Sequence, residues 1–299
     1  MSASNSRSKE MKSAACLPSI SPIRQTSNLK CKSEANNKSN KRSCESTCKG
    51  HIVSFRNVSL QYRGLPKIVR NLTFEIDRFE KIGVVGSRDS GKTALVLALY
   101  RLTELTEGCI KIDGVDISKV DNHVIQKRIK IIHQDPIILS GSLRANLDPF
   151  KEFEDTHLIN ALERVGLSDK LINGNSTNLD AEIQTNCLSI PEKQLILIAS
   201  SFLHKPKILI VQEAQESWAG GDAVKLSKSL EVIETVCREF PTCTILLFIN
   251  QPQALKLCNK VLFIEKGKVA EQGEPHSLMK TQSSKLYQFM AKKFNTKVQ

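Results

Sequence analysis

The sequence predicts an α/β fold in which a mixed β-sheet core carries a helical subdomain. Apolar runs typical of buried strands occur both before and after a region with helical periodicity. A run that is apolar from Ile82 to Val85 leads into a glycine-bounded loop and then into a helical segment. Strands that alternate apolar and polar residues precede this loop and indicate an antiparallel β subdomain. Together these observations predict a phosphate-loop (P-loop) α/β core with two smaller subdomains, one helical and one of antiparallel strands.

The composition is that of a globular protein. The 299 residues are 40% hydrophobic and 25% charged, which are ordinary values for such a chain. No stretch approaches the ~20 consecutive apolar residues of a membrane-spanning helix, and the N-terminus lacks the apolar core of a secretory signal. Nine cysteines at irregular spacings indicate reduced thiols. We therefore expect a cytoplasmic protein with no transmembrane segment in this chain.

Residues 1–50 are expected to form a disordered basic tail. They hold ten Lys and Arg against three Glu, which is +7 of the chain's net charge of +12. Such a tail could contact nucleic acid or an acidic membrane face, but a solvated tail is the favoured interpretation and no nucleic-acid partner is expected. Cys44 and Cys48 have no second Cys or His pair at zinc-site spacing.

The elements before the helical region are expected to be strands. VSFRNVSLQYR and VRNLTFEI alternate apolar and polar residues around a turn at GLP. GCIKIDGVDIS is typical of a hairpin with Gly114 at its turn, and KRIKIIHQDPIIL of a strand that ends in a polar loop around Gln134.

Residues 142–206 are expected to form the helical subdomain, because DTHLINALERVGL and PEKQLILIASSFL carry apolar residues at three- and four-residue spacing. The runs KILIV, TILLFI and KVLFIE then indicate three buried strands. The last of these is expected to turn through Lys266 and Gly267 into KVAEQGEP, and one closing helix to cover SLMKTQSSKLYQFMAKKF.

The loop after the apolar run fits the pattern G-x-x-x-x-G-K-[ST] at Gly86, Gly91, Lys92 and Thr93. Backbone N–H groups of such a loop curl around phosphate oxygens, and the helix N-terminus adds positive potential. The lysine reaches the outer phosphates and the hydroxyl can bind Mg²⁺. A glycine-rich strand-to-helix turn that binds nothing is the alternative.

The order of several motifs resembles the nucleotide-binding domain of ATP-binding cassette (ABC) transporters. The motifs are GSRDSGKT, IDGVDIS, IIHQDPIILSGSLRANLDPF, LSIPEKQL, ILIVQEA and VLFIEKGKVAEQGEP. The third is similar to the second such domain of subfamily C, the multidrug-resistance-associated type. The resemblance covers about residues 51–294 and implies an ABC-type fold; it leaves out residues 1–50 and 295–299, and the transmembrane domains that the family normally carries.

The resemblance implies roles for particular residues. Tyr62 matches the aromatic that stacks on adenine, and the phosphate loop matches at Gly86, Ser87, Arg88, Asp89, Ser90, Gly91, Lys92 and Thr93. Gln134 matches a glutamine that senses Mg²⁺ and the membrane domain, so Thr93 and Gln134 are the expected metal-site residues. Glu213 matches the catalytic base. Leu188–Gln194 matches a segment that contacts the nucleotide of a partner domain.

These roles imply ATP and Mg²⁺ as cofactors. They also imply two partners: a second nucleotide-binding domain, in a homodimer or heterodimer, and a transmembrane subunit or domain. A transmembrane partner would place this chain peripherally at the cytosolic face of a membrane.

Four departures from the family pattern concern the proposed site. Gln212 replaces the aspartate that anchors Mg²⁺, and hard cations prefer carboxylate oxygen. Asp89 replaces a glycine and adds a negative charge near the phosphates. Pro191 replaces a glycine and has no N–H to offer a partner's nucleotide, although Ser189 and Glu192 have the spacing of a helix capping box. Asn250 stands where the family has a histidine, and the loop ESWAGGD also departs from the family wording.

Three functions remain open on this basis. The first is a domain that binds ATP with weak or no hydrolysis and acts with a partner. The second is an active ATPase that powers transport, for which Glu213, Lys92 and Gln134 are the supporting residues. The third is an interaction scaffold that no longer binds nucleotide, with a basic tail.

Overall fold

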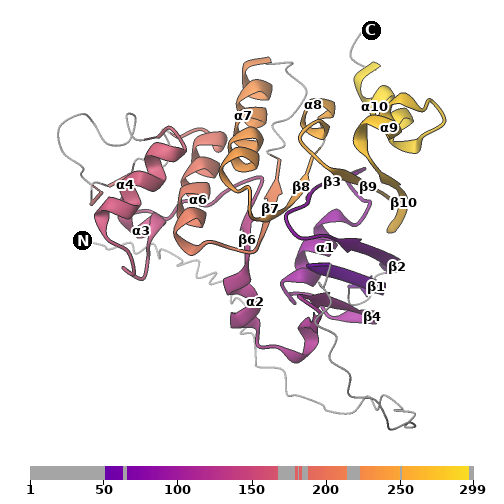
Figure 1. The fold of residues 1–299 in the computed structure, drawn as a ribbon, viewed down its shortest axis with the longest axis horizontal. Coiled ribbons are helices and arrows are strands. Elements are labelled where there is room, and N and C mark those ends of the chain that lie inside the picture. Colours follow the sequence, from indigo (N-terminus) through magenta and orange to yellow (C-terminus); the bar gives the residue numbers. More distant parts are fainter. Residues whose placement is uncertain are drawn as a thin grey trace, which may run out of the picture. The chain divides into compact units, whose positions relative to one another are not determined.

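A computed structural model describes residues 51–62, 66–167, 179–180, 182–183, 188–213, 223–249 and 251–295. All of them belong to the second of the chain's two units, Cys48–Gln299. The predicted tail 1–50, the loop 216–222 and Asn250 lie outside the described residues. Figure 1 shows the described residues of this unit as a coloured ribbon.

The first sheet is the predicted antiparallel β subdomain. Its strands have the order β2-β1-β4-β5, with bounds β1 Val53–Gln61, β2 Lys67–Ile76, β4 Leu105–Ile112 and β5 Val115–Asp116. β1 pairs antiparallel with both β2 and β4. The rings of Phe55 and Phe74 stack at 4.4 Å between β1 and β2 and lie in the core that the sheet shares with the helix α1 (Lys92–Leu99).

The second sheet has the order β10-β9-β3-β8-β7-β6. Its bounds are β3 Lys81–Gly86, β6 Ile129–Ile132, β7 Ile208–Gln212, β8 Thr244–Phe248, β9 Lys260–Glu265 and β10 Lys268–Gly273. All neighbours pair in parallel except β9 and β10, which form a hairpin. The carboxyl ends of β3, β6, β7 and β8 therefore meet at one edge, and their amino ends at the other.

Two tight hairpins confirm the predicted turns. Asp113 and Gly114 join β4 to β5 with φ of 51° and 77°, and Lys266 and Gly267 join β9 to β10 with φ of 49° and 77°. Two successive residues with positive φ are the signature of the turn type that matches the twist of paired strands. Glycine at the second position adopts this conformation without a Cβ clash.

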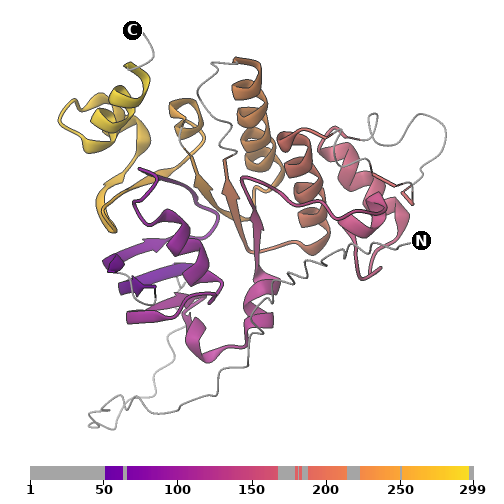
Figure 2. The same cartoon turned by 180° about the vertical axis from the view of Figure 1, so that it is seen from behind.

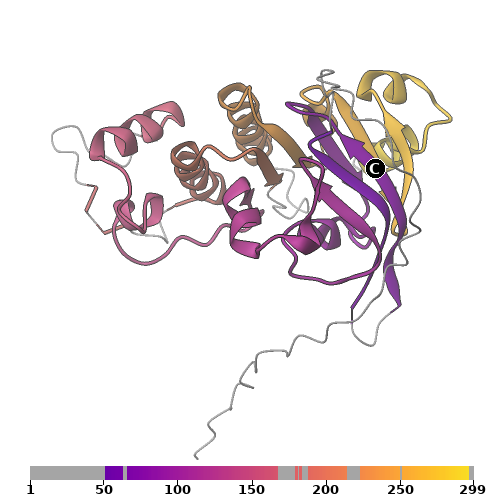
Figure 3. The ribbon, with the colours of Figure 1, turned by 60° about the horizontal axis from the view of Figure 1, so that its bottom comes forward.

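The predicted helical region contains α3 Leu143–Leu147, α4 Asp155–Arg164 and α6 Ile190–His204. α4 and α3 pack against α6, which also packs against α7 (Ala223–Glu239) over the parallel sheet (Figures 1 and 3). Sequence analysis assigned no element to α7, to α8 (Pro252–Leu255), to the short helix η1 (Ile117–Lys119) or to α2 (Asn122–Arg128). The view from behind shows the helical subdomain and the antiparallel β subdomain on opposite sides of α7 (Figure 2).

The prediction of one closing helix is wrong. Two helices, α9 Pro275–Lys280 and α10 Lys285–Asn295, replace it. The break follows from Ser284, whose Oγ accepts a hydrogen bond from Tyr287 N at 3.3 Å and donates one to Glu271 on β10 at 2.8 Å. A serine that accepts a hydrogen bond from a backbone N–H of the first turn acts as the N-cap of a new helix. The hydrogen bond from Ser284 to Glu271 fixes this N-cap against β10.

The four cysteines that the structure describes, Cys109, Cys237, Cys243 and Cys258, are free thiols. Burial raises the pKa of Cys237 to about 11 and that of Cys243 and Cys258 to about 12. Because the thiolate is the reactive form, these three are packing residues. Of the helices that the structure describes, none has the length and apolar character needed to cross a bilayer.

Candidate nucleotide-binding site

The phosphate loop, Gln134 and Glu213 lie at the carboxyl edge of the parallel sheet. The loop follows β3, Gln134 follows β6 by two residues, and Glu213 follows β7 directly. The order β3-β8-β7-β6 places their polar groups along one line. In parallel sheets this edge is where ligands bind, so the fold brings together the residues that the sequence motifs named.

The loop from Gly86 to Lys92 is tightly closed on itself. The Lys92 ammonium group donates to the carbonyl oxygens of Gly86 and Ser87, the latter at 2.6 Å. The Ser90 hydroxyl donates to Ser87 O at 2.8 Å. A Cβ on Gly86 would lie 2.3 Å from Ile264 O and 2.6 Å from Ser90 Oγ, so no other residue fits there.

The loop is also tied to its neighbours. Gly91 has a φ of 97° and caps the N-terminus of α1, where glycine avoids the strain of a left-handed conformation. The N–H of Gly267 in the β9–β10 turn donates to Ser90 O at 3.1 Å. Gly267 O in turn accepts from Arg70 N on β2 at 2.9 Å. The shape of the loop thus depends on both sheets.

These groups fit a phosphate ligand. Ser87, Arg88 and Asp89 are exposed, so the outer turn of the loop is open to solvent. The Lys92 ammonium lies at the loop, where phosphate oxygens can replace its carbonyl partners in a stronger, charge-assisted hydrogen bond. The exposed Asp89 carboxylate opposes this attraction, and Arg88 beside it offsets the charge.

The residues fit a divalent metal less well. Thr93 is exposed at the start of α1, and Gln134 donates to the carboxylate of its neighbour Asp135 at 3.1 Å. Gln212 offers an amide oxygen, which lies 3.3 Å from His133 Nδ1. Within the described ranges, no three His, Cys, Asp or Glu side chains are grouped as metal ligands would be. A hydroxyl and two amides form a weak donor set for a hard cation.

Glu213 is the carboxylate at this edge of β7. Its side chain is buried, with 5% of the residue exposed, and its N–H donates to Phe248 O at the end of β8 at 3.0 Å. The backbone of β8 therefore fixes its position. Tyr62 follows β1 and is half-buried. The catalytic role of Glu213 and the adenine-stacking role of Tyr62 remain predictions.

A buried glutamine joins three elements beneath the site. Gln194 on α6 is 1% exposed, and its Nε2 donates to His133 O at 2.8 Å and to Gln212 O at 3.1 Å. It holds the ends of β6 and β7 to α6. Sequence analysis named Gln194 only as the end of a contact segment and did not name His133. The signal for Gln194 is a polar residue among the apolar positions of a helix, whereas the approach of His133 to Gln212 depends on the register that pairs Ile132 with Val211.

Replacing Gln194 by leucine is expected to lower the free energy of unfolding by about 2 kcal/mol, since two part-buried hydrogen bonds to backbone carbonyl groups are lost. Urea denaturation of the full chain measures the change. Gln126→Leu, at an exposed position of α2, is the matched control and should change stability by less than about 0.5 kcal/mol. Equal losses in the two variants would show that the Gln194 hydrogen bonds do not stabilise the site.

The segment before α6 confirms the predicted capping box. Ser189 is the N-cap residue, and Glu192 accepts a hydrogen bond from Ser189 N at 2.8 Å. Pro191 is buried in the first turn, where the missing N–H does not disturb the helix. Proline at this position leaves the start of the helix intact, but the first turn has one fewer N–H to offer a ligand.

Comparisons with known proteins identify the family. The ABC transporter family model matches residues 69–216. ABC transporter C family member 12 of Dictyostelium discoideum is 37% identical over 237 residues, which are 78% of this chain and 17% of that protein. ATP-binding cassette sub-family C member 3 of Rattus norvegicus is 35% identical over 231 residues, 76% of this chain and 15% of that protein. The ATP-dependent bile acid permease of Saccharomyces cerevisiae is 34% identical over 258 residues, 79% of this chain and 15% of that protein.

A solved structure supports the fold. A bacterial Atm1-family ABC exporter with ATP bound matches with a TM-score of 0.71 and 23% identity over 81% of this chain and 41% of that chain. At this identity the match shows the fold alone. The chain spans about a sixth of the length of the curated relatives named above. This chain therefore contains an α/β nucleotide-binding domain of the ABC transporter family, similar to those of subfamily C.

Proposed function

We propose that this chain binds ATP with weak or no hydrolysis and acts together with a partner cassette or a membrane subunit. One observation carries the proposal. The Lys92 ammonium lies in a closed phosphate loop at the same sheet edge where the metal-anchoring position of β7 is the amide Gln212.

The binding half of the proposal rests on the loop. A Cβ at Gly86 would clash with Ile264 O, and one at Gly91 would be strained at its positive φ, so both positions require glycine. Lys92 supplies the charge. The backbone from Ser87 to Ser90 would surround the phosphates, and Tyr62 would contact the base. Bound ATP would supply the phosphate charge that replaces the carbonyl partners of Lys92.

The weak-hydrolysis half rests on Gln212 and Pro191. Mg²⁺ bound with ATP would supply the charge that stabilises a transferring phosphoryl group. Thr93 and Gln134 would hold it here, but an amide at residue 212 contributes no formal charge to hold the ion. Pro191 removes an N–H donor that a partner's nucleotide would otherwise meet. Together with Asn250, these changes support the proposal that the chain is a degenerate cassette.

The partner half is supported by exposed apolar side chains beside the helical subdomain. Ile137 and Leu139 follow Gln134 and are 82% and 60% exposed, and Phe150 after α3 is 78% exposed. Exposed apolar side chains within this short stretch of the chain support an interaction surface there. We propose that it docks a membrane subunit, which would place the chain at the cytosolic face of a membrane. The similarity to the second domain of subfamily C is part of the same proposal.

Equilibrium binding of a fluorescent ATP analogue to the full chain, with and without Mg²⁺, tests the proposal. Binding should be saturable, and Lys92→Ala should weaken it about tenfold, because a hydrogen bond between charged groups is lost. Lys119→Ala removes an exposed lysine near η1 and should leave the affinity unchanged. Absence of binding in all three proteins would favour the scaffold function and overturn this one.

The buried carboxylate of Glu213 favours a second candidate, an active ATPase that powers transport. It lies directly after β7, where a base could polarise an attacking water molecule. Phosphate release by the full chain separates the two functions. Robust Mg²⁺-dependent turnover that Glu213→Gln abolishes would establish the ATPase, whereas binding without turnover supports the proposed function.

A further inference from the structure

A cluster of basic side chains lies at the amino edge of the parallel sheet, opposite the phosphate loop. Arg78 precedes β3, Arg128 directly precedes β6, and Lys207 directly precedes β7. Parallel pairing brings these amino ends together, as it brings the phosphate loop and Glu213 together at the other edge. We call these three residues the basic cluster. Neither the phosphate loop nor any residue of the candidate nucleotide site belongs to it.

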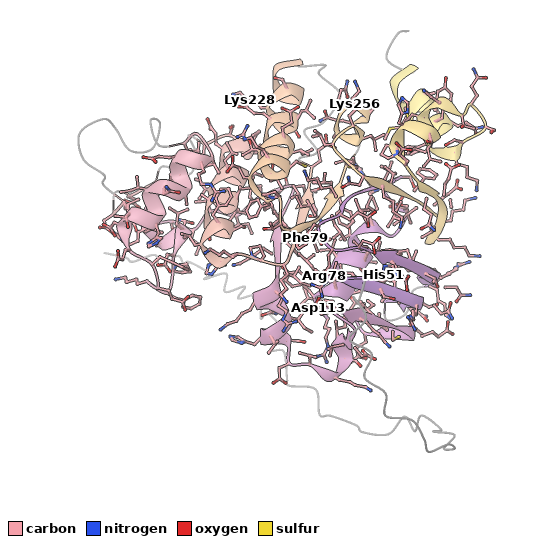
Figure 4. All side chains as sticks on the ribbon, in the orientation of Figure 1. His51, Arg78, Phe79, Asp113, Lys228 and Lys256 are labelled. Atoms are coloured by element: carbon pink, nitrogen blue, oxygen red, sulfur yellow. The ribbon has the colours of Figure 1, made fainter. Side chains whose placement is uncertain are left out.

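The basic cluster surrounds a single carboxylate, that of Asp113 in the β4–β5 turn. Figure 4 labels Asp113 and Arg78. Asp113 accepts from Arg78 Nη2 at 2.5 Å, from Arg128 Nη1 at 3.2 Å and from Lys207 Nζ at 3.1 Å. Its position is fixed, because its N–H donates to Ile52 O at 2.8 Å. Three cations share one anion, so an excess of two positive charges remains.

The cations keep donors that face solvent. The side chains of Arg78, Arg128 and Lys207 are 45%, 44% and 51% exposed, whereas Asp113 is 12% exposed. Each guanidinium group has five N–H donors and the ammonium group has three. The hydrogen bonds to Asp113 use few of these donors, so the cluster presents oriented cations that a second anion can meet without rearrangement.

An apolar pocket adjoins the basic cluster and shares Arg128 with it. Its volume is about 120 Å³, and its remaining lining is aliphatic, from β4, β5, η1, α2 and the residues beside them: Ile112, Val115, Ile117, Val120, Val124 and Ile125. Val115 and Val124 are 50% and 40% exposed, so the mouth of the pocket is apolar. Phe79, next to Arg78 and 57% exposed, adds a further apolar side chain beside the cluster (Figure 4).

The size of the pocket narrows the class of ligand. A cavity of ~150 Å³ holds one benzene molecule, so this pocket holds one branched aliphatic side chain and is too short for a lipid acyl chain. The adjoining cations select negative charge next to that side chain. We propose that this surface, the pocket together with the basic cluster, binds an acidic segment of a partner protein that carries an aliphatic residue among its carboxylates.

The probe for this surface is a labelled seven-residue peptide with one leucine between two glutamate pairs and glycines at its ends. Added to the ¹⁵N-labelled full chain, it should cause saturable chemical-shift changes at amides of residues 112–128 and near residues 78 and 207. The same peptide with alanine for leucine, or with glutamine for the glutamates, should cause smaller changes. Raising the salt concentration should weaken the binding, because the charges are exposed.

Variants of the chain give the decisive comparison. The double variant Arg78→Gln, Lys207→Gln should weaken peptide binding about five- to tenfold, since two exposed charge contacts are lost. Lys127→Gln removes the same kind of charge from an exposed position of α2 and should not change the affinity. Val124→Gln, at the mouth of the pocket, should reduce the preference for leucine over alanine while leaving the dependence on glutamate.

Thermal denaturation and the amide spectrum of each variant show that it is folded. If the double variant is less stable but the wild-type chain does not distinguish the peptides, the cluster only joins the two sheets and the proposal is wrong. Binding of vesicles that contain anionic lipid, without binding of the peptide, would also overturn it in favour of a membrane surface. The outcome is independent of ATP binding, because Lys92→Ala leaves this edge of the sheet unchanged and should bind the peptide normally.

Discussion

Replacing Gln212 by aspartate is expected to make ATP binding depend strongly on Mg²⁺. The ratio of the ATP affinities with and without the metal should rise by about 10- to 100-fold over the wild-type ratio, because a carboxylate attracts a nearby divalent ion by about 1.4–2.8 kcal/mol more than an amide does in this partly hydrated setting. Gln212 ends β7 beside Glu213, and Gln194 holds its backbone, so the new carboxylate would start from the same backbone position but lie one methylene closer to it. Titration of the fluorescent ATP analogue at several Mg²⁺ concentrations measures the ratio.

Gln212→Asn is the matched control for this change. It shortens the side chain as aspartate does but adds no charge, so the Mg²⁺ dependence should stay at the wild-type level. If the Mg²⁺ dependence of ATP binding rises in both variants, side-chain length and not charge determines how well residue 212 supports metal binding. If the Mg²⁺ dependence rises in neither variant, the amide of Gln212 is not what weakens metal binding. Thr93 and Gln134 would then be the next positions to replace.

Replacing Gly267 by alanine is expected to lower the free energy of unfolding by about 3 kcal/mol. Gly267 has a φ of 77°, where a Cβ costs about 1–2 kcal/mol, and that Cβ would lie 2.0 Å from Ile68 O. Backbone must move to remove such a contact, at a further cost of about 1–3 kcal/mol. Urea denaturation measures the loss. Because Gly267 N donates to Ser90 O, ATP affinity should fall as well.

Gly114→Ala separates the cost of the positive φ from the cost of the clash with Ile68 O. Gly114 has the same φ of 77° in the corresponding hairpin, but nothing lies within 4 Å of its added Cβ. Its replacement should therefore cost only the conformational part, about 1–2 kcal/mol, and leave ATP affinity unchanged. Equal losses in the two variants would contradict the clash with Ile68.

Much of the architecture could be predicted because it depends on local patterns. Strands such as β7 and β8 are short, uninterrupted apolar runs, and both hairpins have glycine where a positive φ is required. The start of α6 could be predicted from Ser189 and Glu192, because capping involves residues only three apart. The break between α9 and α10 could not, since the bond that places it runs from Ser284 to Glu271 on another element.

By itself, the sequence determined the α/β class and the phosphate-loop motif, because these depend on residue types at short spacings, and the resemblance to the family predicted that Gln212 stands in place of a carboxylate. Only the tertiary structure decided which groups meet across the chain. It placed Gln194 between the ends of β6 and β7, and it gathered Arg78, Arg128 and Lys207 around Asp113. The physical reason is strand order and register, which arise from the packing of the whole sheet and bring together residues distant in the chain.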